Sequence, residues 1–243
     1  HWNFSVEETR QKLGLDRFRL YNDFEAVALS VPHLIAGTDY HQVGKGKPYH
    51  QKPIGIIGPG TGLGVASLVW DGKSYRAVAG EGGHVTMPPI TQREFDMFEI
   101  IKAHKGYSHV SAERVCSGKG LANIYYALRA LDKRTDLPEE RLPEEISAAA
   151  MNKSCDLCVE TLDLMTAFLG RIAGNLAVTI GAHGGIFIAG GIISQLGTHF
   201  DENRFREQFV SKGRYRDYLD AIPTFIITNK FPAFVGLQAC LDG

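Results

Sequence analysis

Residues 54–70 read IGIIGPGTGLGVASLVW, two apolar runs separated by a cluster of glycines. The apolar runs predict two strands, 54–57 and 63–70, and the glycines predict the bend between them. An Asp-Gly turn follows, and residues 74–79 are predicted as a third strand. Glycine-rich loops at strand ends are typical of α/β proteins that bind ligands at those loops.

Outward from this stretch, strands and helices alternate along the chain, which favours an α/β fold. The longest periodic segment is 155–182, whose apolar residues recur every three or four positions, as on the buried face of a helix. A Ser-Val-Glu-Glu capping box at residues 5–8 opens a helix that should stop at Gly14. Further helices are predicted at 24–29, 91–105, 121–133 and 233–241, further strands at 17–21, 186–189 and 222–228, a loop at 38–52 and a surface connection at 134–143.

Charge and hydropathy argue against two classes of partner. The 243 residues carry a formal net charge of -1, so no bulk field attracts nucleic acid or a membrane surface. No apolar run approaches the roughly 18 residues that a membrane span needs. The first residues lack the basic and apolar regions of a signal peptide, and they lack an initiator Met. We therefore expect no nucleic-acid or membrane partner, and a chain that begins inside a longer one.

The cysteines indicate buried thiols and not a metal site. Cys155 and Cys158 form a C-x-x-C at the start of the long helical segment, with no second pair or histidine close in sequence. Zinc sites of this kind usually need those additional ligands. The remaining cysteines are Cys116 and Cys240. We expect two buried helical thiols, no bound metal, and a reducing, cytoplasmic compartment.

Two glycine-rich loops are candidates for ligand binding. In Gly60-Thr61-Gly62, backbone N–H groups can approach a phosphate and the Thr61 hydroxyl adds a donor, although a plain hairpin bend explains the glycines equally well. The loop is not a Walker loop, because no Gly-Lys-Ser/Thr follows. Glu81 and His84 lie in the second loop and can bind sugar hydroxyls, and the alternative there is a solvated loop.

Two further carboxylates are ambiguous on their own. Asp23, after the predicted strand 17–21, can act as a general base, but an isolated Asp at that position is more often a helix N-cap. Glu113 reads by itself as a first-turn acid that favours the helix dipole. The residues alone therefore predict an α/β protein with a phosphate or sugar site.

Taken together and in order, these motifs resemble those of the bacterial glucokinase family. The resemblance covers nearly the whole chain, and the ordered set is specific. The matching segments are 20–28 (LYNDFEAVA), 58–66 (GPGTGLGVA), 80–84 (GEGGH), 109–118 (HVSAERVCSG) and 184–192 (GGIFIAGGI).

The resemblance implies an α/β, actin-like ATPase (ribonuclease H-like) fold, in which two α/β domains flank a cleft. It implies an enzyme that uses ATP and Mg²⁺ to phosphorylate the 6-hydroxyl of glucose, as in glycolysis, and that forms a homodimer. The implied roles are Asp23 as catalytic base, Asn22, Asp23, Glu81, His84 and Glu113 as glucose ligands, Gly60, Thr61 and Gly62 as the second phosphate loop, and Gly190 and Gly191 as the adenosine motif.

The sequence departs from the family pattern in one respect. The family opens with an Asp-x-Gly-Gly-Thr-Asn phosphate-1 loop, and this motif occurs nowhere here. We therefore expect residues 1–243 to be mainly the large domain with part of the inter-domain region, to lack the N-terminal small-domain segment, and to be inactive alone.

A second comparison of motifs separates this chain from the related ROK sugar kinases and repressors. These proteins follow a Glu-x-Gly-His motif with a cysteine-rich zinc motif, whereas here no cysteine follows His84 until Cys116. This favours the zinc-free glucokinase branch. The alternatives are another hexose kinase of the ROK type, or a sugar-binding regulatory module without catalysis.

Overall fold

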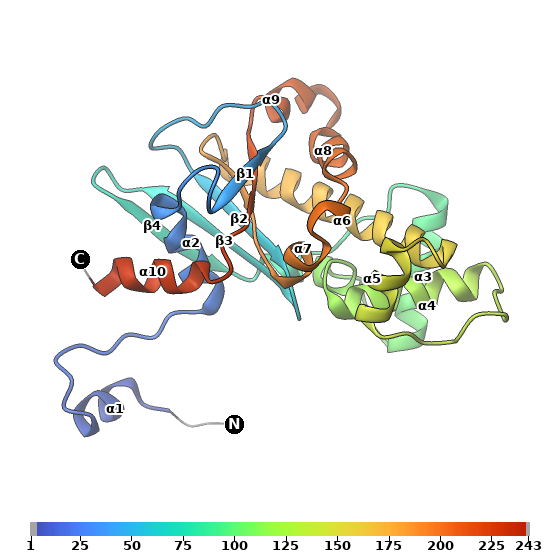
Figure 1. Cartoon of the computed structure of the whole chain (residues 1–243), viewed down its shortest axis with the longest axis horizontal. Coiled ribbons are helices and arrows are strands. Elements are labelled where there is room, and N and C mark those ends of the chain that lie inside the picture. The colour runs from blue at the N-terminus through green and yellow to red at the C-terminus, as the bar shows by residue number, and fades with distance from the viewer. Residues whose placement is uncertain (1–3, 242–243) are drawn as a thin grey trace.

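The computed structural model describes residues 4–241, which build a mixed sheet with helices packed on both faces (Figure 1). The strand order is β1-β6-β5-β2-β3-β4. Strands β2, β5 and β6 run parallel, whereas β3, β4 and β1 pair antiparallel with their neighbours. The strands are β1 Tyr40–Val43, β2 Ile54–Pro59, β3 Leu63–Trp70, β4 Tyr75–Gly80, β5 Gly185–Ile188 and β6 Thr224–Ile227.

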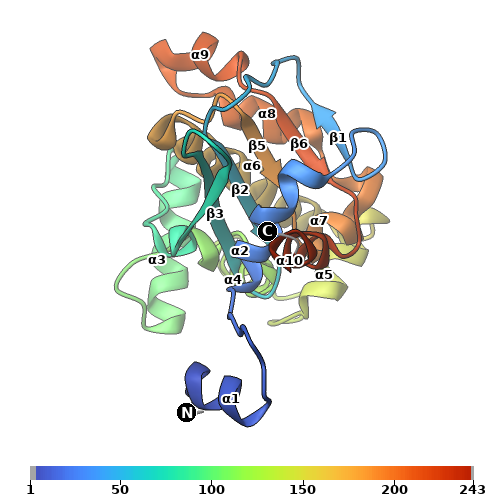
Figure 2. The ribbon, with the colours of Figure 1, turned by 90° about the vertical axis from the view of Figure 1, so that its left-hand side faces the viewer.

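Helices cover both faces of the sheet. Figure 2 shows α2 and α10 in front of the sheet and α6 behind it. The α-helices are α1 Val6–Lys12, α2 Asp23–Ser30, α3 Gln92–Lys105, α4 Gly118–Leu131, α5 Pro143–Met151, α6 Asp156–Ile180, α7 Gly191–Leu196, α8 Glu202–Val210, α9 Arg216–Asp220 and α10 Pro232–Leu241. Short 3-10 helices are η1 Val31–His33, η2 Gly82–His84, η3 Ala112–Arg114, η4 Gly197–His199 and η5 Gly213–Tyr215.

The central strands bury both of their faces. In β5, Ile186 and Ile188 join the larger hydrophobic core on the α6 side, whereas Phe187 between them joins the smaller core on the α2 side. Strand β2 behaves in the same way, with Ile57 in the larger core and Ile56 in the smaller one. Strands that are buried on both faces read as continuous apolar runs, which is why the sequence predicts them well.

The predicted long helix is confirmed as α6, which ends where Gly181 adopts a φ of 63°. Leu169 and Ile172 of its periodic positions are buried in the larger core. The predicted helix at 121–133 begins earlier, at Gly118, because Ser117 Oγ accepts the Gly120 N–H at 3.0 Å and caps the first turn.

Two expectations for the N-terminal third are wrong. Residues 17–21 form no strand, because this exposed segment between α1 and α2 has no neighbouring strand to pair with. The loop expected at 38–52 contains β1, a polar edge strand that pairs with β6. His41 and Gln42 of β1 face solvent, whereas the ring centroid of Tyr40 lies 5.3 Å from that of Phe225. Because two polar residues follow each other, the alternation of apolar and polar residues that marks a strand is missing here.

Several helices were not expected from the sequence. The surface connection 134–143 leads directly into α5, and residues 191–220 contain α7, α8 and α9. Helix α1 agrees with its prediction, with the Glu8 N–H donating to Ser5 Oγ at 3.3 Å, but it stands away from the body of the molecule (Figure 1). None of its residues is buried. No helix within residues 4–241 is long and apolar enough to cross a membrane.

Helices α2 and α10 cross at very short range. A Cβ at Gly236 would stand 2.0 Å from Ala26 O, so only glycine allows this approach. The contact joins residues about 200 positions apart in sequence and fixes α2 against the sheet.

Candidate active site

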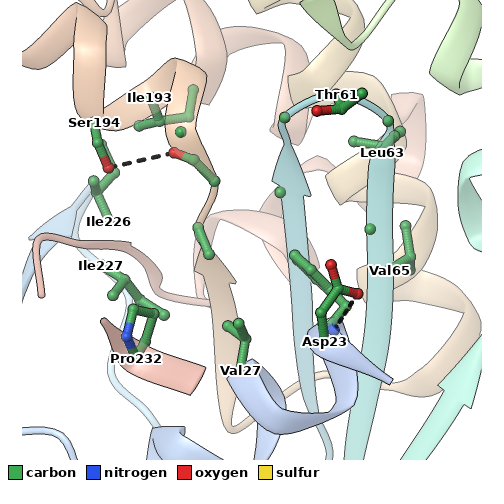
Figure 3. Close-up of a pocket in the computed structure, with 18 of the residues that line it drawn as sticks. Asp23, Val27, Thr61, Leu63, Val65, Ile193, Ser194, Ile226, Ile227 and Pro232 are labelled. Atoms are coloured by element: carbon green, nitrogen blue, oxygen red, sulfur yellow. Dashed lines mark hydrogen bonds between the residues drawn. The ribbon is translucent and has the colours of Figure 1, made fainter. Parts of the chain in front are cut away.

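A cavity of about 980 Å³ lies where the parallel strands end. The loops that follow β2, β5 and β6 all open into it, namely Gly60–Gly62, Ala189–Gly191 and Thr228–Lys230. Carboxyl ends of parallel strands are the usual place for a ligand site in an open α/β sheet. Figure 3 shows Asp23 below the turn that carries Thr61, with Ser194 of α7 across the cavity.

Asp23 is the first residue of α2, and Asn22 is its N-cap. Asn22 Oδ1 accepts the Phe24 N–H at 2.9 Å, and Asp23 Oδ1 accepts the same N–H at 2.7 Å. The capping role suggested for Asp23 therefore belongs to Asn22, which leaves the Asp23 carboxylate at the cavity wall.

Phe24 anchors the start of α2, and with it Asp23, against the sheet. Its ring packs on two glycines, since a Cβ at Gly64 would stand 2.2 Å from Phe24 Cδ2 and one at Gly58 would stand 2.8 Å from Phe24 Cε2. Gly58 and Gly64 of the 58–66 motif thus make room for the residue that follows Asp23. The sequence alone did not reveal that these glycines are needed for packing against Phe24.

The turn Gly60-Thr61-Gly62 is braced from outside the hairpin. The Gly60 N–H donates to Gly62 O at 2.8 Å within the turn, and the Gly118 N–H donates to Gly60 O at 2.9 Å. Glu113 Oε2 accepts the Leu63 N–H at 3.2 Å. The turn is therefore a hairpin bend, as one interpretation of the sequence held, and it also lines the cavity.

Glu113 lies in the first turn of η3, a three-residue 3-10 helix, as the interpretation of it as a first-turn acid expected. Its half-buried side chain lines the cavity, as does Glu81 after β4. His84 is not among the lining residues, but its Nε2 lies 3.7 Å from Glu81 Oε2. Both members of this pair are exposed, with 61% and 85% of their side chains open to solvent.

Gly190 and Gly191 stand on the opposite side of the cavity from Asp23. Gly190 has a φ of 103°, and a Cβ there would stand 2.3 Å from Pro59 O, so a side chain is excluded on both grounds. The Ser194 hydroxyl donates to Gly190 O at 3.3 Å (Figure 3). The structure thus brings all the predicted site residues except His84 to one cavity.

The far end of the cavity holds polar residues that sequence reasoning missed. His41 lines it and lies 2.8 Å from Glu202, and Asn229 donates to Asp39 Oδ1 at 2.9 Å. Hydrogen bonds from the Ile35 N–H and then from Asn229 hold the pKa of Asp39 below its usual value. These residues come from distant stretches of sequence, and the β1–β6 pairing places His41 and Asp39 near Asn229, whereas Glu202 comes from α8.

Comparison with known proteins decides the family. The glucokinase family model matches residues 1–243. A curated glucokinase from Aromatoleum aromaticum is 45% identical over 241 residues, which cover 99% of this chain and 71% of that protein. The chain belongs to the glucokinase family.

Solved structures agree with this membership. A crystal structure of a glucokinase from an Antarctic psychrotroph is 33% identical to this glucokinase-family chain, with a TM-score of 0.87, and the match covers 98% of this chain and 73% of that one. A ROK family glucokinase from Streptomyces griseus, solved with glucose and AMPPNP, shares the fold at 18% identity and a TM-score of 0.65, covering 98% of this chain and 72% of that one. The predicted actin-like α/β fold is confirmed.

None of the four cysteines of this glucokinase-family chain lines the cavity. Cys155 is the N-cap of α6 and Cys158 lies in its first turn, and both are buried, as predicted. Burial, followed by the neighbouring Cys155, raises the pKa of the Cys158 thiol. Within residues 4–241, no group of three or more His, Cys, Asp or Glu side chains is placed to hold a metal ion.

We expect the purified, tag-free protein to contain no stoichiometric zinc. A structural zinc ion needs about four ligands, deprotonated where they are thiols, and Cys155 and Cys158 supply two buried thiols. Elemental analysis by plasma mass spectrometry measures this directly. Detection of one zinc ion per chain, and its absence from the Cys158→Ser variant, would contradict the expectation and favour a ROK-type zinc site.

Gly64→Ala should disturb the site through Phe24. The new Cβ would stand 2.2 Å from the ring, so Phe24 must shift and Asp23 with it. We expect a loss of roughly 1–3 kcal/mol in the free energy of unfolding, the usual effect of overpacking. Gly80→Ala is the matched control, because a Cβ there meets no atom within 4 Å. Equal urea midpoints for the two variants would refute the packing role of Phe24.

Proposed function

We propose that this protein transfers the γ-phosphoryl group of ATP to the 6-hydroxyl of glucose, forming glucose 6-phosphate and ADP. The observation that carries the proposal is the placement of Asp23 and the turn Gly60–Gly62 on one cavity of a glucokinase-family chain. Phosphoryl transfer depends mainly on holding the acceptor and the phosphates in line, and a shared cavity of this kind provides for both.

We assign the catalytic proton transfer to Asp23. As the 6-oxygen of glucose forms its bond to the γ-phosphorus, the bond to the β,γ-bridging oxygen breaks and ADP leaves. The Asp23 carboxylate accepts the proton of the 6-hydroxyl in this step. The carboxylate stands at the head of α2, where Asn22 and Phe24 fix its position, so it is preorganised for this role.

The remaining roles divide between the two ends of the cavity. Carboxylate, amide and imidazole groups suit sugar hydroxyls, and exposed backbone N–H groups beside glycines suit phosphates. We assign glucose to Asn22, Asp23, Glu81, His84 and Glu113, the γ-phosphate to Gly60, Thr61 and Gly62, and the adenosine to Gly190 and Gly191. His84 would act through its contact with Glu81 or by a change of rotamer, because it does not line the cavity.

We propose that Mg²⁺ enters with ATP and neutralises the charge on its phosphates. Magnesium is usually held by one or two carboxylates together with substrate phosphates and water, and not by a protein cage. Since Asp23 is assigned to proton transfer and Glu113 to glucose, we assign no metal ligand within residues 1–243. The AMPPNP found with the Streptomyces griseus protein is an ATP analogue, which supports ATP as the donor.

We further propose that residues 1–243 are mainly the large domain, and that a phosphate-1 loop outside these residues completes the site. The chain spans 71% of its Aromatoleum aromaticum relative, and the phosphate-1 motif is absent from it. We also propose a homodimer and a role in glycolysis, which the family resemblance supports. Cytoplasmic location is supported by the four cysteines, all of them free thiols, which is typical of reducing compartments.

The decisive test is a coupled assay of glucose 6-phosphate formation, with the chain extended to include a phosphate-1 loop. We expect glucose to be phosphorylated in preference to galactose, because a site built to pair hydroxyls rejects a sugar that leaves its polar groups unpaired. Phosphorylation of another hexose in preference to glucose would contradict glucokinase activity. Binding of glucose without turnover would favour a regulatory sugar-binding module.

Residues 1–243 alone should bind glucose weakly and turn none of it over. The proposed glucose ligands are all present, whereas one wall of the phosphate site is not. Calorimetry with glucose and galactose measures the first part, and the coupled assay measures the second. Robust glucose 6-phosphate formation by these residues would show that the phosphate-1 loop is dispensable.

A further inference from the structure

Residues 110–118 connect the two halves of the cavity, and we refer to them as the bridging segment. On the glucose side, the Ala112 N–H donates to Val85 O at 2.9 Å, directly after the loop of Glu81 and His84. On the phosphate side, the Gly118 N–H donates to Gly60 O at 2.9 Å. One short piece of backbone therefore contacts both the loop assigned to glucose and the turn assigned to phosphate.

The backbone of the bridging segment is held firmly. Ala112, Val115 and Cys116 are fully buried in the larger core. The Ser117 hydroxyl donates to Glu113 O at 2.7 Å, so the main chain at Glu113 is fixed by its own neighbour. The backbone that carries Glu113 is therefore anchored by the core and by Ser117.

The Glu113 carboxylate reaches from this fixed backbone to the phosphate turn. Its Oε2 accepts the Leu63 N–H at 3.2 Å, and a Cβ at Gly62 would stand 2.5 Å from the same oxygen. Glycine at position 62 is thus what lets the carboxylate approach the turn. Within residues 4–241, Oε1 makes no hydrogen bond, and the Glu113 side chain lines the cavity that we assign to glucose.

We infer that Glu113 is a positioning residue for the turn Gly60–Leu63 as well as a glucose ligand, and that it couples glucose binding to the geometry of the phosphate turn. The inference rests on the proposed function for its glucose contact. The two oxygens of one rigid carboxylate cannot reorient separately, so a sugar hydroxyl bound at Oε1 sets where Oε2 holds Leu63. By linkage, a turn ordered by phosphate also favours glucose.

Glu81 provides the matched comparison. Like Glu113, Glu81 is a carboxylate that we assign to glucose. Unlike Glu113, it contacts His84, and its side chain is 85% exposed. Glu81→Ala should therefore weaken glucose binding without any change at the phosphate turn. Glu113→Ala should change both.

The first experiment needs no sugar and no turnover. Hydrogen exchange of the Leu63 amide is followed by ¹H–¹⁵N NMR in residues 1–243 and in three variants. Loss of a hydrogen bond to a charged acceptor should speed exchange by at least about tenfold in Glu113→Ala. Glu113→Gln keeps an acceptor and should restore most of the protection, and Glu81→Ala should match the unsubstituted protein. Equal exchange in all four proteins would overturn the positioning role.

The second experiment adds glucose and follows the amide resonances of Gly60, Gly62 and Leu63. At saturation we expect these resonances to shift in the unsubstituted protein and in Glu81→Ala, and to stay in place in Glu113→Ala. Shifts of equal size in Glu113→Ala would overturn the coupling. If glucose shifts no amide resonance anywhere, including those of residues 81–84, both the proposed glucose site and the coupling are wrong. The Leu63 exchange rates still decide the positioning role separately.

Discussion

Asp23→Asn should lower kcat by about 10²–10⁴-fold while leaving the affinity for glucose close to that of the unsubstituted enzyme. The amide has the shape of the carboxylate and keeps an oxygen for the Phe24 N–H, which Asp23 Oδ1 accepts at 2.7 Å. It cannot accept the proton of the 6-hydroxyl. The loss should therefore appear in kcat and not in KM for glucose.

The measurement is a coupled assay on the chain extended to include a phosphate-1 loop, with calorimetry of glucose binding beside it. Glu25→Gln is the matched control, because it removes one carboxylate from the same helix at a residue that does not line the cavity. Retention of more than about a tenth of kcat in Asp23→Asn would exclude Asp23 as the base, since that loss is far below the usual range.

Glu94→Ala should be the most destabilising of the single substitutions considered for this chain. Glu94 and Arg171 form a bidentate pair at 2.7 Å in the core between α3 and α6, with 4% and 8% of their side chains exposed. Removing the carboxylate leaves a buried guanidinium whose charge is uncompensated. Breaking a buried pair in this way typically costs about 3–5 kcal/mol.

Chemical denaturation of residues 1–243 measures this loss, with Glu99→Ala as the control. Glu99 lies on the same helix and pairs with Lys102, but half of its side chain is exposed, so we expect a change within roughly 0.5 kcal/mol. The double substitution Glu94→Leu with Arg171→Met should recover most of the loss, because neither charge then remains buried. A double variant as unstable as Glu94→Ala would show that packing, and not the unpaired charge, is responsible.

The sequence predicts the central sheet because its strands are buried on both sides. Ile54–Ile57 and Ile186–Ala189 are apolar at nearly every position, so their burial is visible without a partner. Strand β1 was missed since only Tyr40 and Val43 turn inward at this sheet edge. Helices α7 and α9 are six and five residues long, too short for a helical period to emerge from a single sequence.

The candidate site divides in a similar way. Asp23, Glu81 and Glu113 could be proposed as site residues because their motifs resemble, in a fixed order, those of a known family. The hydrogen bond between the Leu63 N–H and Glu113 could be found only in the structure. Local rules taken alone placed the N-cap at Asp23, whereas the structure has it at Asn22, and they placed Glu113 in a helical first turn, which the structure confirms as that of η3. His41 and Asn229 carried no signal, since they come together only through the pairing of β1 with β6.

The crossing of α2 and α10 at Gly236 has a consequence for how the protein is made. Residues 22–30 leave the ribosome early, but the helix that holds them on the sheet is translated about 200 residues later. Until then the smaller core is expected to stay open on the face beneath α2, and the carboxylate of Asp23, the base that we propose, is not yet held in place. Enzymatic competence should therefore arise in one late step of synthesis, and nascent chains stalled before residue 232 should expose an apolar sheet face that invites chaperone binding.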